Sequence, residues 1–172
     1  MAQAGPPTTR PKALLVLIVV LCWQAGRGIE GLVLPERSAA YQFFRDRGLG
    51  PLHFVLDALT VAVALAALGY LWRARVGWVQ SALVALGYFA AQAVAVALFM
   101  LGDVDRARSA FLASRASRGQ PVDPERVERL FAMGWIEWRL VMSLTFFALA
   151  AWLAWRGRAY VGPDDAPRTA RR

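Results

Sequence analysis

The stretch LHFVLDALTVAVALAALGYLW, residues 52–72, is apolar over almost its whole length and contains a single carboxylate, Asp57. A helix of about 20 such residues crosses the roughly 30 Å of hydrocarbon in a bilayer. Three more apolar blocks of similar length lie at 13–34, 78–101 and 133–155. The sequence therefore predicts an all-α fold, a polytopic membrane four-helix bundle with both termini on one side.

The composition supports the same class of protein. Of the 172 residues, 58% are hydrophobic, more than a soluble domain usually contains, and mean hydropathy is +0.40. The net charge of +8 comes from 19 arginines and one lysine. No nucleic-acid-binding motif accompanies this charge, and arginines beside spans suit lipid head groups and topology. We expect the lipid bilayer, and not nucleic acid, to be the surrounding partner.

The arginines at the span ends bear on orientation. Arg73, Arg75, Arg156 and Arg158 stand close to span ends on the side of the termini, which favours cytoplasmic termini in a plasma or inner membrane. The polar tails, 1–12 and 159–172, are expected to be disordered. A rival interpretation takes 13–23 as a secretory signal, but cleavage after Ala25 would put a bulky tryptophan where small residues are expected.

The tryptophans agree with the predicted span ends, because indole rings collect at membrane–water boundaries. Two groups at opposite boundaries are predicted: Trp72, Trp78, Trp152 and Trp155 at one, and Trp135 and Trp138 at the other.

Two connections carry structure of their own. The spacing of apolar residues over 102–132 predicts helices, broken at RGQPVDPE, with Asp123 as an N-cap and Pro124 in the next first turn. We expect an extramembrane helical hairpin that extends spans three and four; the alternative is that these helices lie flat on the membrane. The first connection, with Phe43 and Phe44 among arginines, predicts a short interfacial helix.

The ionisable residues of the four spans share one depth. All lie within roughly 10 Å of the boundary opposite the termini, by helical rise. Because charges facing hydrocarbon cost a few kcal/mol, we expect them to point inward as one polar cluster, of binding or structural role. The predicted cluster is Arg27, Glu30, His53, Asp57, Asp103, Glu137 and Arg139.

Spacing predicts pairs within this cluster. Arg27 and Glu30 are three residues apart and can pair, and His53 and Asp57 are four apart on a face that Thr60 extends. Acids outnumber arginines in the cluster, so a protonated His53 or a shared proton is expected. Small residues in the apolar half would permit close helix approach: Ala58, Ala62, Ala66, Gly69, Gly87 and Ala91.

Three functions fit this pattern. The first is a non-catalytic scaffold or accessory component that assembles with itself or a membrane protein partner through the hairpin and the Phe43–Phe44 connection. The second is a small transporter or lipid- or ion-binding protein using the acidic pocket. The third is a metal-dependent enzyme with ligands among Glu30, His53, Asp57 and Glu137. No catalytic motif supports the third, and no cofactor is expected.

Overall fold

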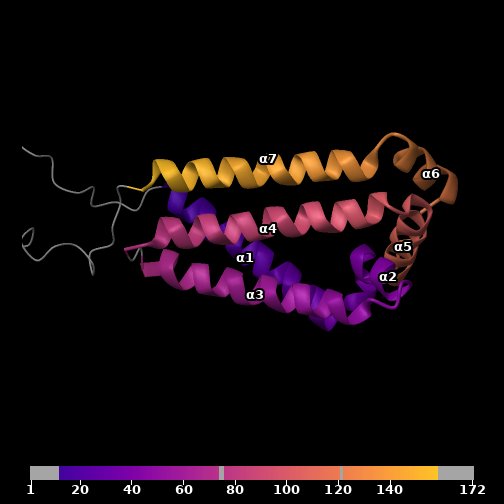
Figure 1. The fold of residues 1–172 in the computed structure, drawn as a ribbon, viewed down its shortest axis with the longest axis horizontal. Coiled ribbons are helices and arrows are strands. Elements are labelled where there is room, and N and C mark those ends of the chain that lie inside the picture. Colours follow the sequence, from indigo (N-terminus) through magenta and orange to yellow (C-terminus); the bar gives the residue numbers. More distant parts are fainter. Residues whose placement is uncertain (1–11, 74–75, 121, 159–172) are drawn as a thin grey trace, which may run out of the picture.

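The structure is a computed structural model that describes residues 12–73, 76–120 and 122–158. These residues form helices and turns, with no strand among them. Four helices are long and apolar enough to cross a membrane: α1 (Lys12–Val33), α3 (Gly50–Arg73), α4 (Trp78–Leu101) and α7 (Trp135–Arg156) (Figure 1). Each end lies within two residues of its predicted position. The chain has the features of a multi-pass membrane protein, and the predicted disordered tails lie outside the described residues apart from Lys12.

Short helices gather at one end of the four long ones (Figure 1). They are a 3-10 turn, η1 (Pro35–Arg37), and the helices α2 (Ala39–Arg45), α5 (Val104–Ser117) and α6 (Pro124–Ala132). The helices α2, α5 and α6 each begin at an N-cap residue. The side chains of Ser38, Asp103 and Asp123 accept a hydrogen bond from a backbone N–H of the first turn. The predicted cap at Asp123 is confirmed, with Glu125 N donating to its Oδ1 at 3.0 Å.

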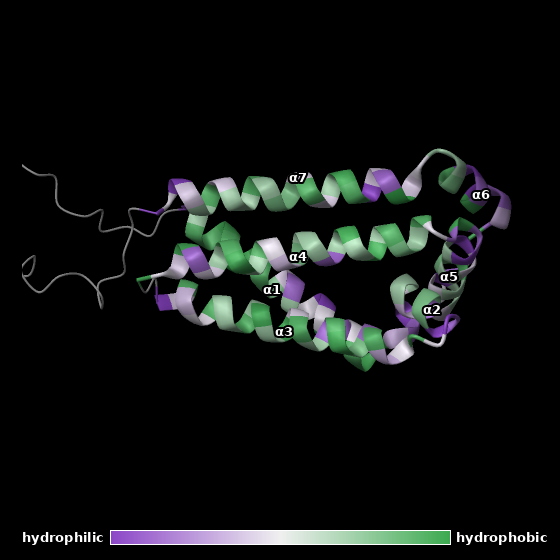
Figure 2. Ribbon diagram, viewed as in Figure 1, coloured by the Kyte–Doolittle hydropathy of each residue, from purple (hydrophilic) through white to green (hydrophobic). Residues whose placement is uncertain are grey.

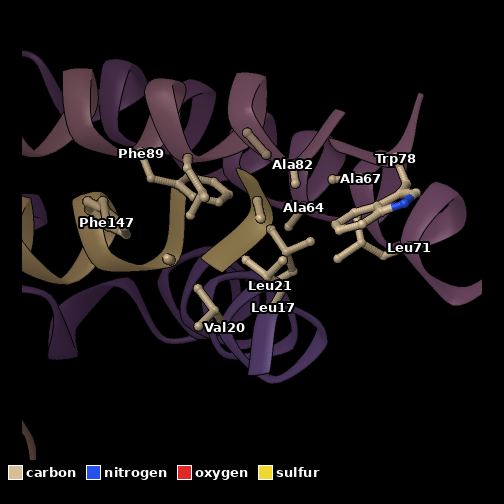
Figure 3. Packing of buried hydrophobic residues seen from close by; sticks show 14 of the residues in the cluster. Leu17, Val20, Leu21, Ala64, Ala67, Leu71, Trp78, Ala82, Phe89 and Phe147 are labelled. Atoms are coloured by element: carbon tan, nitrogen blue, oxygen red, sulfur yellow. The ribbon is translucent and has the colours of Figure 1, made fainter. Parts of the chain in front are cut away.

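The four long helices share one apolar core in the half that faces the termini (Figure 3). Leucines of α1 meet alanines of α3, α4 and α7, and Trp78 lies against this layer with 2% of its surface exposed. Phe89 and Phe147 close the core toward the middle, with ring centroids 6.1 Å apart.

The small residues that permit this packing are not the predicted ones. Ala58, Ala62, Ala66, Gly69, Gly87 and Ala91 are all exposed. The buried small residues are Ala64, Ala67, Ala82, Ala85, Ala150 and Ala154. In an alanine-rich helix every face has similar hydropathy, so the sequence does not indicate which face packs. Trp78 likewise is a core residue and not a boundary anchor, whereas Trp72, Trp152 and Trp155 are exposed.

The connections also differ from expectation. The helix after α4 does not continue it: the chain turns at Gly102 and Asp103, and α5 runs across the end of the long helices, packed on α2 (Figure 1). Helices α5 and α6 therefore do not form the predicted hairpin that extends spans three and four. Phe43 and Phe44, expected at the interface, are 0% and 1% exposed, because α2 lies between α5 and α3.

The approach of α1 to α3 is unusually close at the end where α2 lies. A β-carbon added at Gly28 would lie 2.8 Å from Val61 Cγ2, and one added at Gly31 would overlap the carboxylate of Asp57. Two glycines at this spacing occupy one face of α1, so the helix backbone itself contacts α3. This contact places the polar residues of both helices side by side.

Candidate functional site

A cavity of about 310 Å³ lies at the end of the long helices where α2 and α5 gather. Residues from α1, α3, α4, α5 and α7 line it, together with the segment after α1. Figure 2 shows hydrophilic residues in the halves of α1 and α3 that face this end, besides those at the opposite tip of α3. This end is the depth that the sequence predicted for the ionisable residues inside the spans.

Five of the seven predicted residues line this cavity: Arg27, Glu30, His53, Asp57 and Arg139. They come from α1, α3 and α7, helices that the sequence alone could not place next to one another. The cavity is thus the place where the predicted one-sided cluster meets, with two members missing.

The two missing residues are the acids Asp103 and Glu137. Asp103 caps α5 outside the long helices and pairs with Arg47, whose Nη2 lies 2.9 Å from its Oδ2. This hydrogen bond and the N–H of Arg106 lower the pKa of Asp103 below its ordinary value of 3.8. Glu137 is exposed and lies over Gly134, in the first turn of α7.

Three further arginines line the cavity and were not predicted: Arg37, Arg115 and Arg118. Arg37 belongs to η1, and Arg115 and Arg118 lie at the end of α5. Both segments lie outside the predicted spans, and the predicted cluster contained only residues of the spans. Their position in the sequence could have identified them, because both connections lie at the boundary at which the ionisable residues of the spans cluster. Within α5, Arg108 Nη2 lies 3.1 Å from Asp105 Oδ1.

The charge of the cavity is therefore opposite to the predicted one. Five arginines and two carboxylates line it, a formal excess of three positive charges. The expected pair of Arg27 with Glu30 does not form; Glu30 instead lies 3.8 Å from Arg118.

Two of the lining arginines, Arg27 and Arg139, belong to the long helices themselves. Among the described residues, neither Arg27 nor Arg139 has a carboxylate within 4.0 Å. The charges that act on Arg139 are those of Arg27 and Arg118, and both repel it. A guanidinium has five N–H donors, so these groups are available to an anion.

The predicted pair of His53 and Asp57 is present at the wall of the cavity. His53 Nε2 lies 3.0 Å from Asp57 Oδ2, and the two side chains are 5% and 15% exposed. These two atoms do not form a hydrogen bond of acceptable geometry. Tyr41 packs on the imidazole, with ring centroids 5.3 Å apart. The carboxylate of Asp57 reduces the formal positive charge of the site.

The deep part of the cavity is lined by apolar side chains and by four polar residues: Gln24, Thr60, Gln92 and Ser143. Phe89, Ala93, Leu140 and Phe147 line it. The Thr60 hydroxyl donates to Gln92 Oε1 at 2.9 Å and joins α3 to α4. The cavity thus joins a cationic mouth to a hydrophobic floor.

A metal centre does not fit these residues. Within the part of the chain that the structure describes, no three side chains of His, Cys, Asp and Glu gather closely enough to share an ion. Of the four predicted ligands, Glu137 lies outside the cavity and Glu30 is drawn to Arg118.

The chain was also compared with known proteins. No family model, no curated protein and no solved structure matches it. The functional conclusion therefore rests on the class of the protein and on the chemistry of the cavity.

Proposed function

We propose that this protein is a membrane-embedded binding protein for an anion, which it holds in the arginine-lined cavity at one end of a four-helix bundle. The observation that carries the proposal is the excess of five arginines over two carboxylates around that cavity. Guanidinium groups donate paired, charge-assisted hydrogen bonds to phosphate and carboxylate oxygens. Unpaired charges inside spans are costly, and a bound anion would supply the missing partner.

This proposal keeps the lipid- or ion-binding alternative drawn from the sequence but reverses the charge of the ligand. The acidic pocket was inferred from Asp103 and Glu137 together with Glu30 and Asp57. With the first two elsewhere and three arginines added, the site repels a cation and attracts an anion.

A scaffold role stays a prediction, and the structure gives it less support than the sequence did. It depended on a projecting hairpin and on Phe43 and Phe44 as contact surfaces. Those phenylalanines are buried, and Ala107 and Ala110 of α5 are turned inward against the same cluster. Assembly with another chain would need a different surface.

The proposed orientation follows from the arginines at the other end. With cytoplasmic termini, the cavity would open at the opposite face, in the outer leaflet of a plasma or inner membrane. Arg156 and Arg158 would then lie at the cytoplasmic head groups, each stacked on a tryptophan of the last turn of α7.

Binding of inorganic phosphate to the purified full-length protein in a neutral detergent tests the proposal. Isothermal titration calorimetry should detect saturable binding, and both Arg27→Gln and Arg139→Gln should weaken it by about tenfold or more, the loss of one charge-assisted contact. Arg156→Gln is the matched control, because it removes the same charge at the other end.

Saturable binding of Mg²⁺ or Ca²⁺ in place of phosphate would contradict the proposal. So would phosphate binding that Arg156→Gln weakens as much as Arg139→Gln does, because the attraction would then come from overall charge. An unchanged unfolding temperature in each variant excludes misfolding as the cause.

A further inference from the structure

We infer that the anion is the phosphate head group of a membrane lipid, which reaches the cavity sideways between α1 and α7. This inference rests on the proposed anion binding and names the source of the anion.

Helix α5 covers part of the side of the cavity that faces away from the bilayer. Its last turn is tied to the segment after α1: the Ser117 hydroxyl donates to Glu36 O at 2.8 Å, and Arg118 Nη2 donates to Arg37 O at 2.7 Å. Along the rest of its length α5 packs on α2 through buried alanines.

The side between α1 and α7 is different. These helices share the apolar core near the termini, and α1 then runs obliquely toward α3 (Figure 1). Where they have diverged, the cavity is lined by Arg27 on α1 and Arg139 on α7, and both side chains are exposed. Both arginines lie within the long apolar helices, and neither has an acidic partner among the described residues.

The depth of the cavity suits an amphiphile. Arg37, Arg115 and Arg118 lie outside the long helices, at the level of head groups. Phe89 and Phe147 are each 12 residues from the helix end on this side, about 18 Å into the span by helical rise. One compartment therefore offers guanidinium groups at its mouth and aromatic rings at its floor.

The size of the cavity limits what enters. At about 310 Å³ it lies at the lower end of the range for small-molecule sites. Such a volume accommodates a head group and the first carbons attached to it, so the remaining acyl chains would stay in the bilayer. The inferred pose therefore requires the head group to enter between α1 and α7.

Native mass spectrometry of the full-length protein released from nanodiscs tests the inference. The nanodiscs contain phosphatidylcholine with a minor fraction of phosphatidic acid of the same acyl chains. We expect phosphatidic acid to be enriched on the protein by about tenfold over its fraction in the disc. The double variant R27Q/R139Q should lose this enrichment, and the control R156Q/R158Q should keep it.

The source of the phosphate is decided by competition with glycerol 3-phosphate and inorganic phosphate. Lipid enrichment that survives excess of either supports the inference. If the soluble anions bind and displace the lipid, or bind while no lipid is enriched, the inference is wrong and anion binding stands. If neither lipid nor soluble phosphate binds, both proposals fail. Equal loss in both double variants would show attraction to surface charge and would also overturn the inference.

The route is tested with Ser143→Trp, which places a large side chain on α7 one turn from Arg139, at the lining of the cavity. Met142→Trp is the control, since Met142 is exposed and does not line the cavity. We expect the first variant to abolish lipid enrichment and the second to preserve it. Full enrichment in a folded Ser143→Trp protein would exclude access between α1 and α7.

Discussion

The carboxylate of Asp57 occupies the space in which a side chain at Gly31 would lie, so the backbone of α1 contacts the Asp57 side chain of α3 directly. The same carboxylate lies 3.0 Å from His53 Nε2. Helix contact and polar site are thus one feature: the glycine that brings the helices together also makes room for the acid at the cavity wall.

Replacing Gly31 by alanine should destabilise the protein by about 1–3 kcal/mol, the usual cost of overpacking. The added methyl group would displace Asp57 or separate α1 from α3. Gly26→Ala is the control on the same helix, because a β-carbon there meets nothing within 4 Å. Unfolding in mixed micelles by SDS titration measures both. Equal stability of the two variants would contradict the close helix contact.

Replacing Thr60 by valine should lower the free energy of unfolding by about 0.6–1.7 kcal/mol, the range measured for interhelical hydrogen bonds in membranes. The change keeps the shape of the side chain and removes the hydroxyl that donates to Gln92 Oε1. Thr145→Val is the control, since Thr145 is exposed. The same SDS titration compares them, and a larger effect at Thr145 would reject the predicted bond.

Asp103 should make stability depend on pH. Its pKa is lower in the folded protein than in the unfolded chain, chiefly through the hydrogen bond from Arg47. Folding therefore favours the charged form, and the stabilisation is present above the ordinary value of 3.8 and lost as pH falls through the folded pKa.

Asp103→Asn should accordingly lower the unfolding temperature near neutral pH, and the difference from wild type should shrink as pH falls through the lowered pKa of Asp103. The control is Asp105→Asn, because the side chain of Asp105 is 89% exposed. Thermal unfolding followed by circular dichroism at several pH values gives the comparison. A constant difference between wild type and Asp103→Asn at every pH would argue against the charge of Asp103.

Removal of the Asp57 charge should strengthen phosphate binding several-fold, because it raises the positive excess of the cavity. Asp57→Asn keeps the size of the side chain. Glu137→Gln should leave the affinity unchanged, since that acid lies outside the cavity. Calorimetric titration with phosphate measures both variants. A weaker affinity in Asp57→Asn would favour the acidic pocket first inferred from the sequence.

The depth of most residues in the site could be predicted from the sequence, because it depends only on their distance from the end of a span. Counting residues from each span end placed Arg27, His53 and Arg139 at one boundary, and the structure brings them to one cavity. The sign of the net charge around the cavity could not be predicted from the sequence. It depends on Arg115 and Arg118, which reach the cavity only because α5 folds across the end of the long helices.

The sequence by itself determined the four apolar helices, their ends and the end at which charges collect. Hydropathy and chain length decide these features, since lipid requires about 20 apolar residues per crossing whatever the neighbours are. Only the tertiary structure decided which faces pack, where α5 lies and which arginines share a cavity. Those depend on the close approach of α1 to α3 at Gly28 and Gly31 and on the turn at Asp103, where shape between distant segments outweighs composition.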